Sequence, residues 1–151
     1  DCWPSVTWAV VEYDRTPKQA YRTLQQVYQP VLIGANIERD RLLTSIDRGG
    51  HPRPLLLTPW VVNDRTEELR GCTYRVQLDG SAGVLEIGVS APFDVPADAV
   101  LAHASAVAIP APPPGHYTLH LTLLCDGQEL SDNSYELKYE TLPVDAKDTS
   151  L

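Results

Sequence analysis

Two pairs of carboxylates are the first candidates for chemistry in this sequence. Glu12 and Asp14 lie two residues apart, and Glu67 and Glu68 are adjacent. Acid–base catalysis requires such groups inside a pocket that also positions a substrate. Both pairs fall in segments that we expect to be a turn and a hairpin loop, where carboxylates are solvated. We therefore predict that this chain holds no catalytic residues.

The four histidines offer a second chemistry, metal binding. His116 and His120 are four residues apart in HYTLH, a spacing that would bring them to one metal ion on a helix. This run alternates as a strand, so the two positions would be about 13 Å apart. His51 falls in a loop rich in Gly and Pro, and His103 in an Ala-rich strand. We predict no metal site and no cofactor.

The three cysteines are Cys2, Cys72 and Cys125. The second and third lie in strand-like runs, so a bridge between facing sheets is one alternative. An immunoglobulin-type bridge has its core Trp between the two cysteines, whereas Trp60 precedes both of these. We therefore expect two buried, reduced thiols that act as small hydrophobes.

Composition limits the class of protein. The chain has 151 residues, 43% of them hydrophobic and 21% charged, which is typical of one globular domain. Its net charge of −8 argues against nucleic acid or an anionic membrane as a partner, since both bind basic surfaces. No apolar run approaches the roughly 20 residues of a membrane helix. We expect a soluble, cytoplasmic protein.

One helix is predicted, over residues 17–29. Thr16 is a suitable N-cap, Pro17 suits the first helical position, and Pro30 ends the helix. The apolar residues of this segment recur at helical spacing and form one stripe, which consists of Ala20, Tyr21, Leu24, Val27 and Tyr28.

Strands and turns follow the helix. Apolar residues alternate in VLIGANI, CTYRVQL, VLEIGVSA, HYTLHLTLL and SYELKYE, and HASAVAI is a short, Ala-rich strand candidate. PLLLTPWVV is an apolar run in which Pro59 indicates a bulge or a sheet edge. Asp79-Gly80 and Asp126-Gly127 are expected to turn the chain. About seven strands in roughly 110 residues predict a mainly β protein, an immunoglobulin-like antiparallel β-sandwich preceded by the helix.

The stretch DCWPSVTWAVVEYDRTPKQAYRTLQQVYQPVL resembles the segment in which the catalytic barrel of family 2 glycoside hydrolases ends, with the β-mannosidase branch as the best match. The matching residues are Asp1, Cys2, Trp3, Pro4, Trp8, Glu12, Tyr13, Lys18, Tyr21, Tyr28, Pro30 and Val31. WVVND resembles the family's strand of that pattern. LSDNSYELKY resembles its last strand, with Asn133 and Tyr135 in the expected places.

The resemblance implies a parent enzyme that holds the active site. Asp1 and Trp3 would follow the eighth barrel strand, on the face that carries the active site. Trp3 would stack on the sugar and Asp1 would hydrogen-bond its hydroxyls, so both are substrate-binding candidates in the parent only. The family's two catalytic carboxylates come from earlier barrel strands and would precede Asp1. Trp8 we expect to be buried against the helix or the sandwich.

The resemblance also divides the chain. Residues 1–30 would be the end of the catalytic (β/α)8 barrel, residues 31–141 the sandwich, and residues 142–151 a flexible tail. The expected function is that of a non-catalytic C-terminal domain, which braces the catalytic barrel of a retaining enzyme acting on a β-linked sugar. An autonomous carbohydrate-binding or protein-interaction module is the alternative.

The helical stripe needs a partner where the barrel is absent, since each exposed large apolar side chain forgoes roughly 1.5 to 3 kcal/mol of burial. The stripe could fold onto its own sandwich or pair with the same stripe of a second molecule. We expect the twofold homodimer, because the linker at residues 30–32 is short and directs the helix away from the sandwich. Trp3 and Trp8 would join that contact.

Overall fold

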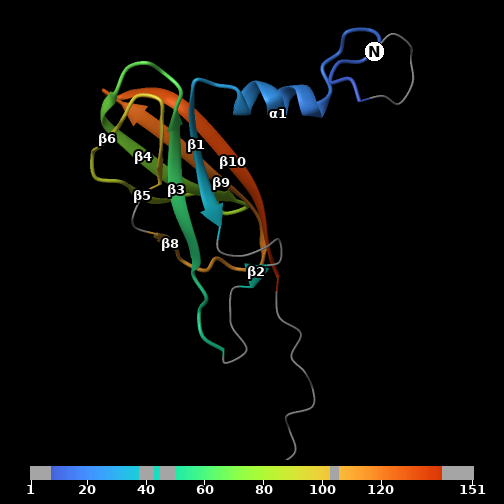
Figure 1. The fold of residues 1–151 in the computed structure, drawn as a ribbon. Helices are drawn as coiled ribbons and strands as arrows, with labels where there is room; N and C mark the ends of the chain where they lie inside the picture. The colour runs from blue at the N-terminus through green and yellow to red at the C-terminus, as the bar shows by residue number, and fades with distance from the viewer. Residues whose placement is uncertain (1–7, 38–42, 45–49, 103–105, 141–151) are drawn as a thin grey trace, which may run out of the picture.

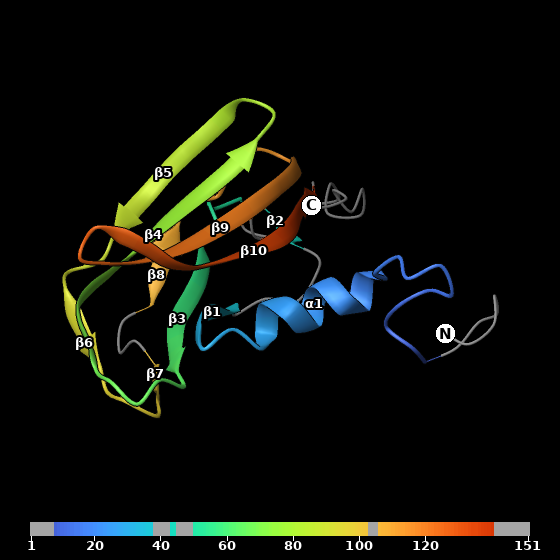
Figure 2. The same ribbon diagram turned by 90° about the horizontal axis from the view of Figure 1, so that it is seen from above.

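The computed structural model describes residues 8–37, 43–44, 50–102 and 106–140 of the chain. Two β-sheets pack face to face, and a helix extends beside them (Figures 1 and 2). The prediction of a mainly β sandwich preceded by one helix is confirmed. The segments assigned to the tail, 142–151, and to the start of the barrel remnant, 1–7, lie outside the described residues.

Helix α1 (Gln19–Val27) is shorter than predicted. The prediction that Thr16 caps the helix and that Pro17 begins it is wrong, because the N-cap position is Lys18 and no side chain bonds the cap. Pro17 instead pairs with Val11 as an isolated antiparallel bridge. Two residues that favour a helix start are therefore held outside the helix by pairing with the residues that precede them.

The smaller sheet places β3 (Leu55–Asn63) between β1 (Val31–Ile37) and two short strands, β7 (Ala99–Ala102) and β8 (Val107–Ile109). Its pairs are antiparallel. The single strand expected at residues 103–109 is thus represented by β8, and residues 103–105 lie outside the described residues.

Pro59 lies in the central strand of this sheet, neither at its edge nor at a bulge, so the expectation of a bulge or edge is wrong. Its register with Ala35 on β1 is continuous. On the other side, β3 pairs with β7 through residues 60–63 and with β8 through residues 55–57. Pro59 falls between those two pairings, where its missing N–H costs no ladder bond.

The larger sheet has the order β2-β10-β9-β4-β5, and β6 also pairs with β4. The bounds are β2 (Leu43–Thr44), β4 (Leu69–Gly80), β5 (Gly83–Val89), β6 (Phe93–Val95), β9 (Gly115–Cys125) and β10 (Gln128–Glu140). All pairs are antiparallel except β2 with β10. Figure 2 shows this sheet stacked on the smaller one, with β5 at its far edge.

The two predicted Asp-Gly turns have different outcomes. Asp126-Gly127 is confirmed as the turn between β9 and β10, and both residues have positive φ (52° and 74°), as a type I′ turn requires. Asp79-Gly80 is not a turn, because both residues belong to β4 and the chain reverses at residues 81–82. Gly80 is packed under Tyr117, whose ring carbons would lie 2.5 Å from an added Cβ.

The core lies between the two sheets and confirms the predicted alternation. In β4 and β9 every second residue faces inward, and the inward row of β9 is buried from Leu119 onward. The largest fully buried side chains are Tyr139, Ile33, Leu43, Leu55, Leu57, Leu78, Ile109, Leu119, Leu121, Leu123, Val31 and Val76. Strand β5 is the exception, since Val84, Leu85 and Val89 remain exposed at the sheet edge.

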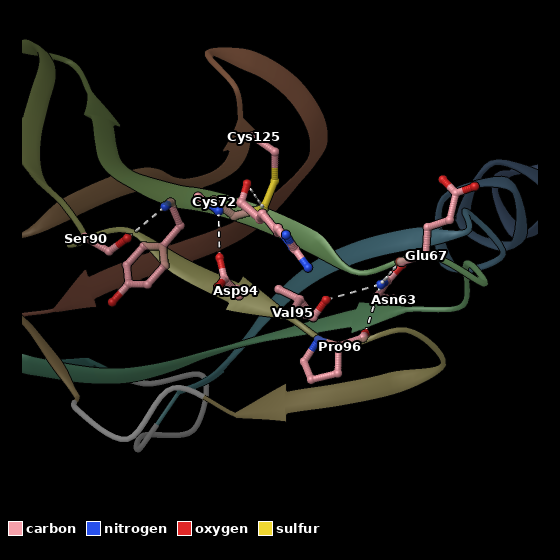
Figure 3. Close-up of a disulfide and its surroundings, with 11 residues drawn as sticks. Asn63, Glu67, Cys72, Ser90, Asp94, Val95, Pro96 and Cys125 are labelled. Atoms are coloured by element: carbon pink, nitrogen blue, oxygen red, sulfur yellow. Dashed lines mark hydrogen bonds between the residues drawn. A yellow bond between two sulfur atoms is a disulfide. The ribbon is translucent and has the colours of Figure 1, made fainter.

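Cys72 and Cys125 form a disulfide, so the expectation of two reduced thiols is wrong (Figure 3). The bridge does not join facing sheets. It links neighbouring strands of one sheet, since Thr73 pairs with Leu124 and the cysteines occupy the next positions of that register. Their Cα atoms are 4.2 Å apart, close to the separation of a non-hydrogen-bonded antiparallel pair. The position of Trp60 bears only on a bridge between facing sheets, whereas this bridge lies within one sheet.

Candidate functional site

The two predicted substrate-binding residues, Asp1 and Trp3, lie outside the described residues. The structure therefore describes the residues that follow them. Trp8 is fully exposed (102%), so the expectation that it is buried is wrong. The segment that precedes helix α1 extends away from both sheets (Figure 1).

Residues 9–18 form a small hairpin that leads into the helix. Glu12 N–H donates to the Thr16 carbonyl (2.8 Å), and Lys18 N–H donates to the Val10 carbonyl (2.9 Å). Arg15 adopts a positive φ of 70° at the tip. Thr16 N–H donates to Asp14 Oδ1 (3.0 Å), and this hydrogen bond lowers the pKa of Asp14. The hairpin thus fixes where helix α1 begins.

Helix α1 turns its apolar stripe away from the sandwich. Gln26 of the helix is hydrogen-bonded to the sandwich, through Nε2 to Asn133 Oδ1 (3.0 Å). At about 100° per residue, Leu24 lies about 160° around the helix from Gln26. No residue of the helix is buried, and Tyr21, Leu24 and Val27 are exposed. The alternative in which the stripe folds onto its own sandwich is therefore wrong.

Side chains of β10 close the free edge of β1. Ile33 N–H donates to Ser131 Oγ (3.1 Å), Asn133 Nδ2 donates to the Ile33 carbonyl (3.0 Å), and Ala35 N–H donates to Tyr135 Oη (3.0 Å). Three alternate residues of one strand thus replace the backbone partners that β1 lacks on that side. The sequence singled out Asn133 and Tyr135 as matches to a pattern, but it did not predict this role.

Asn133 also joins the helix to the sandwich. Its Oδ1 accepts from Gln26 while its Nδ2 donates to the Ile33 carbonyl, so one amide connects α1, β10 and β1. The Pro30 carbonyl accepts from Asp64 N–H (2.9 Å) at the helix–strand joint. A hollow of about 290 Å³ lies beside this joint, lined by residues 29–31, 65 and 129–132. The helix is thus held at a defined position by polar contacts near its C-terminal end.

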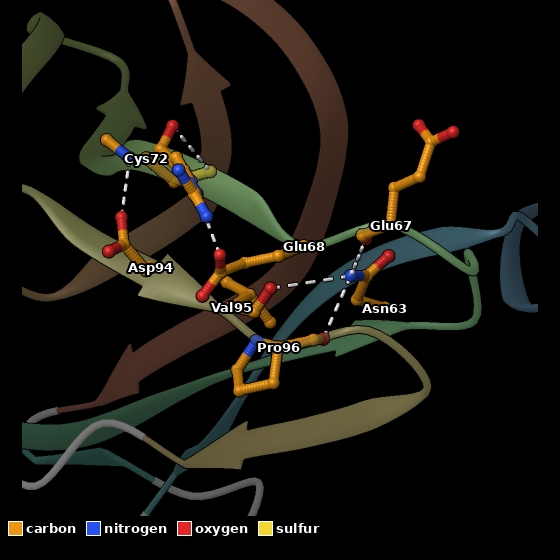
Figure 4. Close-up of polar contacts among 9 residues, drawn as sticks. Asn63, Glu67, Glu68, Cys72, Asp94, Val95 and Pro96 are labelled. Atoms are coloured by element: carbon orange, nitrogen blue, oxygen red, sulfur yellow. Dashed lines mark hydrogen bonds and ion pairs between the residues drawn. The ribbon is translucent and has the colours of Figure 1, made fainter.

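Asn63, in the WVVND pattern, holds two loops together. It is fully buried, and its Nδ2 donates to the carbonyls of Glu67 (2.9 Å) and Pro96 (2.9 Å). Its Oδ1 accepts from Arg65 N–H (3.2 Å). Figures 3 and 4 show the amide between the loop after β3 and the end of β6. These contacts give the pattern a structural role.

The candidate carboxylates lie on exposed turns and loops. Glu12 and Asp14 belong to the N-terminal hairpin, and Glu12 forms an ion pair with Lys18 (3.8 Å). Glu68 Oε2 accepts from Arg70 Nε (2.7 Å), as Figure 4 shows, and this contact raises the pKa of Arg70. Neither pair lines the hollow beside the helix.

The histidines are not brought together. His116 and His120 lie on β9, as expected for a strand, and His51 is exposed in a loop. His103 lies outside the described residues. In the described part of the chain, no three His, Cys, Asp or Glu side chains form a group that could hold a metal ion. Among the same residues, no helix has the length and apolarity that crossing a membrane requires.

Comparison with known proteins adds sequence and fold relatives to this geometry. No family model matches the chain. Beta-mannosidase B of Aspergillus fumigatus is 31% identical over 71 residues, which is 47% of this chain and 8% of that protein. The chain therefore spans only a small part of this relative's length.

Two solved structures share the fold. The β-D-mannosidase from Dictyoglomus thermophilum superposes over 91% of this chain and 15% of its own, with a TM-score of 0.59 and 21% identity. The chain is thus similar to β-mannosidases in sequence over part of its length and in fold. A β-glucuronidase from glycoside hydrolase family 2 gives a TM-score of 0.54 over 73% of this chain and 13% of its own, with 12% identity. The family resemblance drawn from DCWP, WVVND and LSDNSYELKY is thus confirmed.

Proposed function

We propose that this chain is a non-catalytic sandwich domain of a β-mannosidase-like glycoside hydrolase, and that it braces the enzyme's catalytic barrel through helix α1. The observation that carries the proposal is the orientation of the helix. Gln26 is bonded to the sandwich, while the apolar stripe on the opposite side has no partner among the described residues. The matched segment covers only 8% of Beta-mannosidase B. In an enzyme built like that relative, the rest of the polypeptide would provide a large partner for the stripe.

The polar joint explains how bracing would work. Asn133 and Ser131 tie α1 and β1 to β10, and the Pro30 carbonyl is tied to Asp64 on the WVVND segment. A helix of nine residues is marginal alone in water, so its position depends on such contacts and on burial of its stripe. A barrel that buries the stripe would then be held at a defined orientation to the sandwich.

The proposal assigns substrate contact to the parent enzyme. Asp1 and Trp3 would border the sugar there, and the catalytic carboxylates would come from the barrel. The chain by itself should not hydrolyse aryl β-mannosides or β-galactosides, because both candidate carboxylate pairs are exposed and neither lines the hollow beside the helix. It should bind monosaccharides no more tightly than millimolar, since one wall of a site buries little of a ligand.

Variants of the full-length enzyme test the brace. Leu24→Asp with Tyr28→Asp adds two negative charges to the stripe, and Arg22→Glu makes the same charge change on the opposite side of the helix. We expect the stripe variant to lower the thermal midpoint and the activity of the full-length enzyme, and the Arg22 control to change neither. Equal behaviour of the two variants would refute bracing through α1.

The coding region upstream of Asp1 provides an independent test. We expect it to encode a barrel with a glutamate at the end of each of two strands. A coding region without a barrel would overturn the assignment to a larger hydrolase. Activity that remains with the purified isolated chain would overturn the non-catalytic role.

A further inference from the structure

The smaller sheet carries apolar side chains on its outer side as well as on the side that faces the core. On β1 and β3 the inward residues belong to the core, and the alternate residues point outward. The register aligns Leu32, Val62 and Val100 across three strands on that outer side. Together with Leu56 and Trp60, these side chains form what we call the apolar outer face. None of the five belongs to the core cluster between the sheets. Their exposure differs, since Leu32 is buried, Leu56, Trp60 and Val62 are half-buried, and Val100 is 69% exposed.

Trp60 is built into this face. It pairs with Gly34 on β1, and a Cβ added to Gly34 would lie 2.3 to 2.7 Å from the six-membered ring of the indole. The indole therefore lies flat across β1, and the glycine makes room for it. Trp60 is half-buried by this contact, so its outer surface is still available.

The face carries no charge. None of the residues in β1, β3, β7 and β8 is Asp, Glu, Lys, Arg or His, although 21% of the whole chain is charged. The outer side of the larger sheet carries Arg75, Glu86 and Glu136, as a solvent-facing antiparallel sheet normally does. Asn36 and Thr58 are the polar pair on the outer side of the smaller sheet. A sheet without charges on either side is typical of one that is covered on both sides.

We propose that the apolar outer face docks against an uncharged, aliphatic surface of another domain of the same polypeptide. This inference rests on the proposed function, in which the chain is one domain of a longer enzyme. The contact would be distinct from the contact between helix α1 and the barrel, because it uses the outer side of the smaller sheet and not the helix. It would hold the sandwich from a second side.

The area of the face favours a domain over a second copy of this chain. A nine-residue strand and three strand widths give a face about 30 Å long and about 15 Å wide, or about 450 Å². A stable dimer buries about 800 Å² on each partner. Interfaces between domains of one chain bury about 600 to 1,500 Å² in total, which two such faces supply.

Net charge and the length of the relative also favour another domain over a second copy of this chain. Pairing of two copies through this face would gain no ion pairs that offset the repulsion between two net charges of −8, because the face itself carries no charge. A tethered domain docks without this cost of association. The matched segment covers 8% of Beta-mannosidase B, so a protein built like that relative has ample further structure to cover the face.

Hydroxyl-radical footprinting of the full-length enzyme and of the isolated chain tests the contact directly. We expect oxidation of Trp60 and Val100 to fall several-fold in the full-length enzyme relative to the isolated chain. Val84, which is exposed on β5 of the other sheet, is the internal control and should label equally in both. Equal labelling of Trp60 in the two proteins would overturn the proposal.

Matched lysine variants provide the second readout. Val100 and Val84 are similarly exposed strand valines (69% and 62%), so Val100→Lys and Val84→Lys should leave the isolated chain equally stable. In the full-length enzyme, Val100→Lys should lower the thermal midpoint and Val84→Lys should not. An isolated chain that dimerises and becomes monomeric with Val100→Lys would overturn the proposal in favour of a second copy. Protection of Trp60 by mannan oligosaccharides would overturn it in favour of a carbohydrate.

The helix variant separates this inference from the proposed function. If Leu24→Asp with Tyr28→Asp lowers the thermal midpoint of the full-length enzyme and Val100→Lys does not, the helix contact stands and the second contact is refuted. If Val100→Lys lowers that thermal midpoint and the helix variant does not, docking through the outer face is supported and bracing through α1 is refuted.

Discussion

The side-chain amide of Asn63 is fully buried, and both of its polar atoms are hydrogen-bonded to the backbone. Asn63→Ala would leave two carbonyls and one N–H without their partner. We expect a loss of about 2–4 kcal/mol in the free energy of unfolding, measured by denaturant titration. Asn36→Ala, at an exposed position of β1, is the control and should change stability by no more than about 0.5 kcal/mol.

The lowered pKa of Asp14 predicts that the stability of the N-terminal turn depends on pH. Its pKa in the folded chain lies below the usual value of 3.8, because the carboxylate accepts from Thr16 N–H. A depressed folded pKa means that the contribution to turn stability is present above the unfolded pKa and is lost as the pH falls through the folded value. We expect the Thr16 amide resonance to titrate below pH 3.8 in NMR spectra. Asp14→Asn should abolish that titration, and an unchanged profile would contradict the assignment.

At the scale of elements, Tyr117 links β4 to β9 by packing against two glycines. An added Cβ would lie 2.5 Å from the ring at Gly80 and 3.4 Å from it at Gly115. The ring is also held by Oη donating to the Pro113 carbonyl (2.9 Å) and by an edge contact with Tyr139. Gly80→Ala should therefore destabilise the chain by about 1–3 kcal/mol in thermal or chemical unfolding. Gly115→Ala, with ordinary contact distance, should have a clearly smaller effect.

The disulfide clamps β4 to β9 and should be a major element of stability. It closes a segment of 53 residues, for which the chain-entropy model gives about 4 kcal/mol. Cys72→Ala with Cys125→Ala should lower the free energy of unfolding by up to that amount in urea titrations. Cys2→Ser is the matched control and should leave stability unchanged.

Thiol titration of the denatured, unreduced chain checks the bridge itself. One free thiol per chain is expected, from Cys2, and none in Cys2→Ser. Three thiols would contradict the disulfide. Disulfides are rare in reducing compartments such as the cytosol. A count of one free thiol would therefore argue against the expected cytoplasmic location.

At the scale of the whole molecule, the isolated chain presents an uncovered helical stripe. Tyr28 is 80% exposed and Leu24 38%, so pairing of two stripes would bury surface that the sandwich leaves open. We predict that the isolated chain self-associates through α1 in sedimentation experiments at high concentration. Leu24→Asp with Tyr28→Asp should make it monomeric, whereas Arg22→Glu should not. A monomeric wild-type chain at high concentration would show that the stripe does not pair.

Local pattern was enough to predict much of this fold. The alternation in CTYRVQL and HYTLHLTLL predicted the inward rows, because side chains of a strand alternate whatever the strand pairs with. Asp126-Gly127 predicted a turn, because two positive φ values suit these residues. The family patterns around DCWP and WVVND predicted the relatives, because they depend on residue identity alone.

Contacts between distant residues decided the rest. Strand register brought Cys72 to Cys125, and the ring of Tyr117 explains why Gly80 lies within a strand although Asp79-Gly80 has the composition of a turn. Pairing of Val11 with Pro17 moved the start of the helix, and the bond from Gln26 to Asn133 directed the apolar stripe outward. Sequence spacing does not contain these outcomes, because each depends on which segment lies alongside which in the folded chain.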